Sequence, residues 1–314
     1  MTLPPAGADA ATSAIETHLR RIARVVLERG ALLTAERASL QVEVKRGPQD
    51  LVTDADRALE AWLYDVTSAA FPHDGFLGEE QGWRRGPTGE RDWVVDPIDG
   101  TVNFVHGLPW SCCSVAAVVS GEPVAGLVVD LSRREVYLTA GPDRPSERNG
   151  RAVRVAPGAD LAGRLVLVEL PADRPLAVLD DLVAEIRRRG GAIRVLGAGA
   201  LALASVAAGQ AHAAVQVDPH PWDAAAGIAL VRHAGGSVLG LSAAYELDGG
   251  GPLFAGNPAV AELLRDAAAR GVLDATATDG PPARELAEER GFGDGPARHQ
   301  QPGGRQERSM RAHG

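Results

Sequence analysis

The sequence predicts an α/β protein, with an α+β N-terminal half and a C-terminal half of the alternating α/β type. β-Rich runs at residues 114–119, 124–129 and 135–139 are separated by short turn segments, a pattern typical of an antiparallel meander. After the turn pair Asn149-Gly150, short apolar runs alternate with helical patterns. This alternation indicates helices that cover the faces of a sheet.

Two amphipathic helices are predicted before the meander. The first carries apolar residues on one face from Ile15 to Val26 and is expected to end at Gly30, and the second is expected at residues 55–70. The strands and helices of the C-terminal half are predicted at residues 165–168, 176–189, 193–196, 200–208, 213–217, the segment around Asp223, 237–239, 253–255 and 258–270.

Composition excludes several classes of protein. The chain has 314 residues, 45% of them apolar, and a formal net charge of -9, which argues against a general nucleic-acid-binding surface. Its two cysteines, Cys112 and Cys113, are adjacent and are expected to be reduced core thiols. Residues 1–14 lack the pattern of a secretion signal, and no apolar run is long enough to cross a bilayer. We therefore expect a cytoplasmic protein without membrane contact.

The most informative motif is Asp96-Pro97-Ile98-Asp99-Gly100-Thr101, which follows the apolar run 93–95. Pro97 has no amide donor and a fixed φ, and Gly100 can adopt φ values that other residues avoid. Such a turn can direct two carboxylates and backbone carbonyls at one point, which suits Mg²⁺ because this ion prefers oxygen ligands. An isolated Asp-x-x-Asp is more often only a cap or a turn.

Three further acidic segments favour a shared site. Glu79 and Glu80 follow the short apolar run 76–78, and Asp56 lies where the second helix begins. Asp223 is predicted to be the N-cap of the helix that follows Pro221-Trp222. Acids at the ends of several elements, far apart in the sequence, indicate one common cavity.

These segments together resemble the inositol monophosphatase family of Mg²⁺-dependent, lithium-sensitive phosphatases. The resemblance is carried by Leu-Val-Thr-x-x-Asp ending at Asp56, by Gly-Glu-Glu, by Trp-Val-Val-Asp-Pro-Ile-Asp-Gly-Thr-Val-Asn-Phe, and by Trp-Asp-x-Ala-Ala-Gly containing Asp223. It extends from about residue 15 to about residue 270. The family implies a layered α/β/α/β/α sandwich with the metals between the two halves, and a homodimer.

The resemblance also implies a set of metal ligands. Glu79, Asp96 and the carbonyl of Ile98 would hold the first metal, and Asp96, Asp99 and Asp223 the second. Asp96 would therefore bridge. The implied cofactor is Mg²⁺, two or three ions per site, with inhibition by Li⁺.

The family's catalytic and phosphate-binding roles can be carried over in the same way. Thr101 and Asp56 would position and deprotonate the attacking water, with Glu79 counted among the catalytic residues. The backbone amides of Gly100 and Thr101 would contact the phosphate at a helix start, a role that unpaired helix amides suit. Lys45 would lie near the phosphate entrance, and Glu80 would support the ligands.

The predicted substrate pocket departs from the family pattern. It would be lined by Gly197, Ala198, Gly199 and Gln216. Gln216 stands where inositol phosphatases usually carry a glutamate that binds sugar hydroxyls, and Ala198 replaces a residue that is often Ser or Thr. An amide still donates and accepts, but it lacks the charge-assisted bond of a carboxylate.

Three functions stay open on these residues. The first is Mg²⁺-dependent hydrolysis of inositol monophosphate or a similar polyol or sugar phosphate. The second is the same fold acting on histidinol phosphate, fructose 1,6-bisphosphate or 3'-phosphoadenosine 5'-phosphate. The third is a metal-binding partner protein without turnover, against which the intact acids argue. No nucleic-acid partner is expected.

Four segments are expected along the chain. They are a flexible N-terminus at 1–13, an N-terminal half with the metal loop at 14–150, a C-terminal half at 151–274 and a disordered tail at 275–314. The tail is rich in Gly, Pro, Arg and Glu without hydrophobic periodicity.

Overall fold

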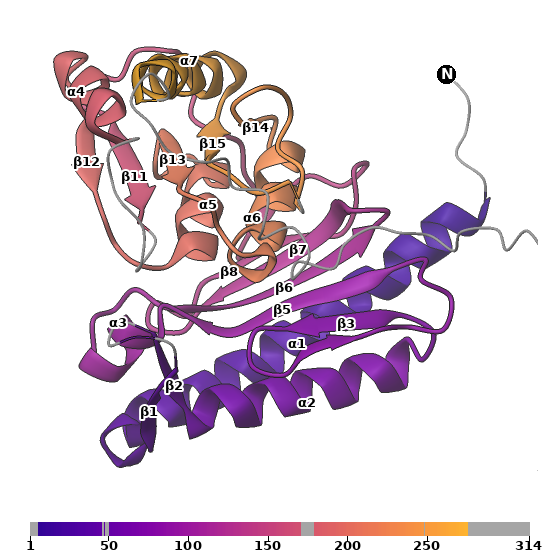
Figure 1. Cartoon of the computed structure of the whole chain (residues 1–314). Helices are drawn as coiled ribbons and strands as arrows, with labels where there is room; N and C mark the ends of the chain where they lie inside the picture. Colours follow the sequence, from indigo (N-terminus) through magenta and orange to yellow (C-terminus); the bar gives the residue numbers. More distant parts are fainter. Residues whose placement is uncertain (1–5, 46, 48–49, 171–178, 248, 276–314) are drawn as a thin grey trace, which may run out of the picture. The chain divides into compact units, whose positions relative to one another are not determined.

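The computed structural model describes residues 6–45, 47, 50–170, 179–247 and 249–275. Within these ranges the chain forms three β-sheets and seven α-helices (Figure 1). The helices are α1 (Ala6–Glu36), α2 (Asp54–Ala70), α3 (Thr101–His106), α4 (Asp180–Arg188), α5 (Gly199–Ala207), α6 (Pro221–His233) and α7 (Pro258–Ala275), with a short 3₁₀ turn at Arg37–Ser39.

The largest sheet has eight strands in the order β10-β9-β8-β7-β6-β5-β3-β4. Neighbouring strands are antiparallel except for β3 and β5, which are parallel. Its strands are β3 (Gly75–Gly78), β4 (Gly82–Arg84), β5 (Asp92–Asp99), β6 (Cys112–Val119), β7 (Glu122–Asp130), β8 (Val136–Thr139), β9 (Glu147–Arg148) and β10 (Arg151–Ala152). The meander predicted from the sequence is β6, β7 and β8.

The second sheet has five strands in the order β12-β11-β13-β15-β14. β11 is parallel to both β12 and β13, whereas β15 is antiparallel to both of its neighbours. The strands are β11 (Leu165–Glu169), β12 (Ala192–Arg194), β13 (Ala213–Gln216), β14 (Ser237–Leu239) and β15 (Leu253–Gly256). A separate two-stranded sheet pairs β1 (Val42–Val44) with β2 (Leu51–Thr53).

The elements stack as α/β/α/β/α layers (Figure 1). α1 and α2 cover one face of the eight-stranded sheet, where their apolar faces pack on Trp93 and Val95. α5 and α6 pack on both sheets, and α4 and α7 cover the outer face of the five-stranded sheet. The fold class and the layered architecture predicted from the sequence are confirmed.

The middle layer packs closely because its residues are small. All nine residues of α5 are buried, and α6 presents Ala224, Ala225 and Ala226 to its surroundings. A Cβ on Gly126 of β7 would collide with the backbone of Ala226. Short side chains therefore let helix and sheet backbones approach, and this approach brings the N-terminal start of α6 to the carboxyl end of β5.

The first helix is longer than predicted at both ends. Residues 6–13, expected to be flexible, are helical, in keeping with the high helix propensity of their alanines. Gly30 does not end the helix but lies inside it, where a Cβ would lie 3.0 Å from Leu131 Cδ2. The glycine therefore serves close packing rather than termination. Strands β1, β2, β4, β9 and β10 were not predicted, because each has only two or three residues.

Several other expectations can be compared with the structure. Cys112 and Cys113 are free and buried, as predicted. No helix among the described residues is long and apolar enough to span a membrane. The predicted tail falls outside the described residues after Ala275, and so do residues 176–178 of the helix predicted at residues 176–189. The division of the chain at residues 13, 150 and 274 stays a prediction.

Candidate metal centre

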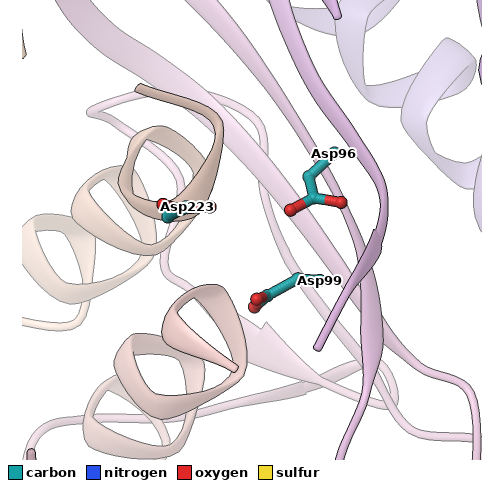
Figure 2. A group of neighbouring side chains, drawn as sticks. All are labelled: Asp96, Asp99 and Asp223. Atoms are coloured by element: carbon teal, nitrogen blue, oxygen red, sulfur yellow. The ribbon is translucent and has the colours of Figure 1, made fainter. Parts of the chain in front are cut away.

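Asp96 and Asp99 lie at the carboxyl end of β5, and their carboxylates are on the side of the strand that faces the middle helices, with Asp99 reaching the start of α5 (Figure 2). In a regular strand, residues three apart would face opposite sides of the sheet. Here the register shifts between them, so that Asp96 pairs with Ser114 and Asp99 with Cys112. Pro97 lies in this bulge, where its missing amide removes no ladder hydrogen bond. The bulge turns both carboxylates to one face.

Asp223 completes a cluster of three acids. One side-chain oxygen from each of Asp96, Asp99 and Asp223 can be chosen so that all three lie within 4.8 Å of one another. Asp223 is not the N-cap of α6, as predicted, but the third helical residue after the N-cap His220. Its Oδ2 accepts a hydrogen bond of 3.0 Å from the His220 amide. This bond fixes the carboxylate while leaving its other oxygen for the cluster.

Burial and mutual repulsion raise the pKa values of this cluster. Asp96 is fully buried, and burial together with the charges of Glu79, Asp99 and Asp223 raises its pKa well above the ordinary value. Burial raises the pKa of Asp99 to about 7, against hydrogen bonds from Ala200, Cys112 and Gly199 that lower it. Burial and the charge of Asp99 likewise raise the pKa of Asp223.

The residues of the cluster fit a hard cation. Asp96 Oδ1 is buried, and none of the described residues forms a hydrogen bond to it. Oxygen atoms alone make up the cluster, which is the donor set that Mg²⁺ prefers. Cations would offset both the missing hydrogen bond and the repulsion between the carboxylates.

Glu79 lies directly after β3 on the rim of the same pocket. The pocket has a volume of about 190 Å³, and its lining includes Glu79, Asp96, Ile98, Asp99, Gly100, Thr101, Gly197 and Asp223. Lys45 Nζ donates to Glu79 Oε1 at 2.8 Å and to Glu80 Oε1 at 2.7 Å. Burial opposes the charge on Lys45, but these two carboxylates outweigh it and raise its pKa. Lys45 therefore contacts the acids rather than standing free at the pocket entrance.

Asp56 and Thr101 lie side by side, as a water-activating pair would require. Thr101 Oγ1 lies 3.2 Å from Asp56 Oδ1 and 2.9 Å from the Ile98 carbonyl oxygen. Asp56 is the third residue of α2 and accepts the Thr53 amide at 2.8 Å in a capping box. Burial raises the pKa of Asp56 to about 6, against the hydrogen bonds from Thr53.

Gly100 joins β5 to α3 and requires the absence of a side chain. Its φ of 82° lies in the left-handed region, and a Cβ would lie 3.0 Å from the carbonyl oxygens of Gly197 and Trp110. The turn at Gly100, between β5 and α3, therefore contacts the turn before α5. This contact brings the predicted substrate residue Gly197 to the pocket, whereas Ala198, Gly199 and Gln216 are not among its lining residues.

The turn before α5 also holds Asp99. The amides of Gly199 and Ala200 donate to Asp99 Oδ1 and Oδ2 at 3.2 and 2.8 Å. Gln216 lies beneath Gly199, where a Cβ would lie 2.7 Å from its Nε2. Both amide atoms of Gln216 are buried without a hydrogen-bond partner in the described part of the chain. Its predicted role in substrate binding stays a prediction.

Comparison with known proteins agrees with this geometry. The model of the family described as "Inositol monophosphatase family" matches residues 13–274. The chain belongs to the inositol monophosphatase family. The inositol-1-monophosphatase of Mesorhizobium japonicum is 35% identical over 238 residues, which cover 72% of this chain and 85% of that protein.

Other members of the inositol monophosphatase family carry a second kind of name. Nus factor SuhB of Escherichia coli K12 is 32% identical over 222 residues, covering 70% of this chain and 83% of that protein. The crystal structure of the extragenic suppressor protein SuhB from Bartonella henselae superposes with a TM-score of 0.75 at 29% identity, covering 83% of this chain and 99% of that one. The proteins similar to this chain thus include some named inositol monophosphatase and others named Nus factor SuhB.

Three residues near the centre were not predicted from the family resemblance. Glu60 accepts the amides of Glu80 and Gln81, both at 2.8 Å, and so holds the turn that carries Glu79. Glu169 and Asn103 contact the turn before α5. Asn103 lies in α3 within the motif that begins at Asp96, so inspection of that motif could have found it. Glu169 ends β11, so a search for polar residues at strand ends could have found it.

Proposed function

We propose that the protein is a phosphatase that hydrolyses the phosphate monoester of a small polyol or sugar, with inositol monophosphate as the first candidate. The observation that supports this most directly is the cluster of Asp96, Asp99 and Asp223 beside the pair formed by Asp56 and Thr101. Membership of the inositol monophosphatase family, and relatives named for that activity, support the same reaction.

The acids of the pocket are the proposed Mg²⁺ ligands. Glu79, Asp96 and the Ile98 carbonyl would hold one ion, and Asp96, Asp99 and Asp223 another. When bound, the ions supply positive charge that offsets the phosphoryl and leaving-group charge, and they make water more acidic. Inhibition by Li⁺ belongs to the same proposal.

Asp56 and Thr101 are the proposed proton acceptor and relay. The Thr101 hydroxyl donates to Asp56 Oδ1, so its lone pairs are free to accept a hydrogen bond from the attacking water. The water proton can then move to the Thr101 oxygen while the hydroxyl proton moves to Asp56. Because Asp56 is buried with a pKa of about 6, it can accept a proton near neutral pH.

The backbone around Gly100 is the proposed phosphate contact. Gly100 and Thr101 occupy the N-cap and first position of α3, where amides lack intrahelical partners and favour an anion. Lys45 would contribute positive charge at the rim. It contacts Glu79 and Glu80, so cation binding at Glu79 would release part of that charge toward the substrate.

The predicted substrate residue Gln216 suggests how the class of substrate can be tested. Gln216 presents a buried donor and a buried acceptor instead of a carboxylate. Release of inorganic phosphate should be measured over inositol, sugar, histidinol and nucleotide phosphates, with Mg²⁺ and with added Li⁺. We expect hydrolysis of a polyol phosphate that needs Mg²⁺. Gln216→Glu should raise kcat/KM for inositol phosphate about tenfold, the amount gained from one charge-assisted bond.

A metal-binding partner protein without turnover remains the second candidate, because relatives are named Nus factor SuhB. Absence of phosphate release from every substrate in the panel, with Mg²⁺ bound, would support that candidate against the phosphatase. The proposed homodimer and cytoplasmic location can be checked by light scattering and by cell fractionation.

A further inference from the structure

We propose that Glu169 is a positioning residue of the metal centre. It anchors the backbone turn at residues 196–200, and this backbone turn orients Asp99. Glu169 is the last residue of β11 and is outside the proposed ligand set. The inference rests on the proposed function, because it assigns Glu169 a part in holding one of the proposed ligands.

Glu169 is built into the base of this turn. Its Oε2 accepts the Gly197 amide at 2.7 Å, and the amides of Leu196 and Ala198 also favour its charged form. Glu169 is 8% exposed, and its Oε1 has no partner among the described residues. A buried carboxylate directed at consecutive amides fixes the path of that backbone, since the amides have little other choice of partner.

The same turn is held from the opposite side by Asn103 of α3. Asn103 Nδ2 donates to the carbonyl oxygen of Leu196 at 2.6 Å, and it lies 2.9 Å from the Trp110 carbonyl oxygen. Glu169 therefore holds the amide side of the turn and Asn103 its carbonyl side. Gly197 lies in this turn with a φ of 74°, a left-handed conformation that favours glycine.

The restrained turn ends in the two amides that contact Asp99. Gly199 and Ala200 follow Gly197 by two and three residues and donate to both oxygens of Asp99. Asp99 comes from the other sheet, so no local hydrogen bond within β5 supplies this restraint. The amides of Gly199 and Ala200 lie one hydrogen bond away from the proposed ligand Asp99, and partners of this kind commonly change metal affinity about 10–100-fold when removed. Glu169 acts on them through the turn that it anchors.

Glu169→Leu is the decisive variant, because it removes the acceptor and keeps most of the volume. We expect Mn²⁺ affinity, measured by electron paramagnetic resonance, to fall about tenfold or more, with a parallel rise in the Mg²⁺ concentration needed for half-maximal phosphate release. The same turn carries the predicted substrate residues Gly197, Ala198 and Gly199, so Mn²⁺ affinity measured without substrate, rather than KM, is the deciding readout.

Two further variants separate positioning from general stability. Glu169→Gln keeps a carbonyl oxygen for the Gly197 amide, so its Mn²⁺ affinity should stay within about threefold of the parent. Asp74→Asn is the matched control: Asp74 accepts bonds from Arg91 and Trp93 at the far end of β5. It should lower the melting temperature without changing Mn²⁺ affinity.

The results can overturn this inference alone or together with the proposed function. A folded Glu169→Leu protein with the parent's Mn²⁺ affinity would overturn the positioning role, and so would equal losses in the Gln and Leu variants. If Glu169→Leu does not fold, Glu169→Asp, which draws the acceptor back by one methylene, should still weaken Mn²⁺ binding. A parent protein that binds no Mn²⁺ and releases no phosphate would overturn both proposals.

Discussion

The metal-free centre should be a source of instability that a single neutral substitution relieves. Two unit charges 4.8 Å apart repel by about 3.5 kcal/mol at an effective dielectric constant of about 20, and each acid of the cluster has two such neighbours. Burial, and to a smaller extent the charge of Glu79, raise the pKa of Asp99 to about 7, so ionising this group in the folded protein is unfavourable as well.

Asp223→Asn is the substitution that tests this. The asparagine keeps a carbonyl oxygen for the His220 amide, so the start of α6 should remain intact. Removing one of three clustered charges should raise the free energy of unfolding of the metal-free protein by about 3 kcal/mol at pH 8. For a domain of this size that is a rise in melting temperature of roughly 6–12 °C.

The effect should depend on pH in a definite direction. Because the folded-state pKa values are raised, the folded protein binds more protons than the unfolded protein between about pH 4 and pH 7. The contribution of these acids to the parent's free energy of unfolding is therefore most favourable at the acid side of this window, and it is lost as the pH rises through the window. At pH 5 the cluster is largely protonated, and the gain from Asp223→Asn should nearly disappear.

Urea unfolding with EDTA or with excess Mg²⁺, at pH 5 and pH 8, measures these quantities. Mg²⁺ should stabilise the parent at pH 8 and stabilise Asp223→Asn much less, because the variant lacks one proposed ligand. Asp181→Asn, which neutralises an exposed acid of α4, serves as the control. The reasoning is refuted if metal-free Asp223→Asn is less stable than the parent at pH 8, or if Mg²⁺ stabilises both equally.

Three further predictions concern the residues around the cluster. Thr101→Ala should lower kcat for phosphate release by about 100-fold or more, with less than about 1.5 kcal/mol lost in urea unfolding, since only the contacts of one hydroxyl with Asp56 and the Ile98 carbonyl oxygen disappear. A normal kcat would exclude the relay. Gly100→Ala should destabilise the fold by about 2–3 kcal/mol, and Gly82→Ala by about 1 kcal/mol. Both glycines have positive φ, but only at Gly100 would an added Cβ lie 3.0 Å from carbonyl oxygens. Equal losses of stability in thermal unfolding would contradict the packing argument. The value of kcat should rise with pH, with an apparent pKa at or below about 6, because Asp56 must be deprotonated to accept a proton and bound cations lower its pKa. A kcat that is flat or falls from pH 5 to 7 would argue against Asp56 as the proton acceptor.

Local sequence signals predicted most of the fold. The meander strands, the α5 and α6 helices and the strand at 237–239 follow from apolar periodicity and turn residues, which act over a few positions. The capping box between Thr53 and Asp56 is equally local. Errors fell where a local signal had a tertiary explanation: Gly30 reads as a helix stop, but it allows Leu131 to pack against the helix.

The acids of the metal centre were also visible in the sequence, because they follow apolar strands and precede helices. Their order alone matched a family, and the family is now established. The sequence therefore determined the fold class, the family and the residue types available to the chemistry, since all three depend on patterns within short segments.

Only the tertiary structure decided how these acids meet. The bulge that turns Asp96 and Asp99 to one face exists because β6 pairs with β5 on either side of Pro97. The amides that hold Asp99 come from α5, 100 residues later in the chain, and their anchors Glu169 and Asn103 come from two more elements. Such contacts join residues that have no local relation, so their energies arise only when both sheets have packed against the middle helices.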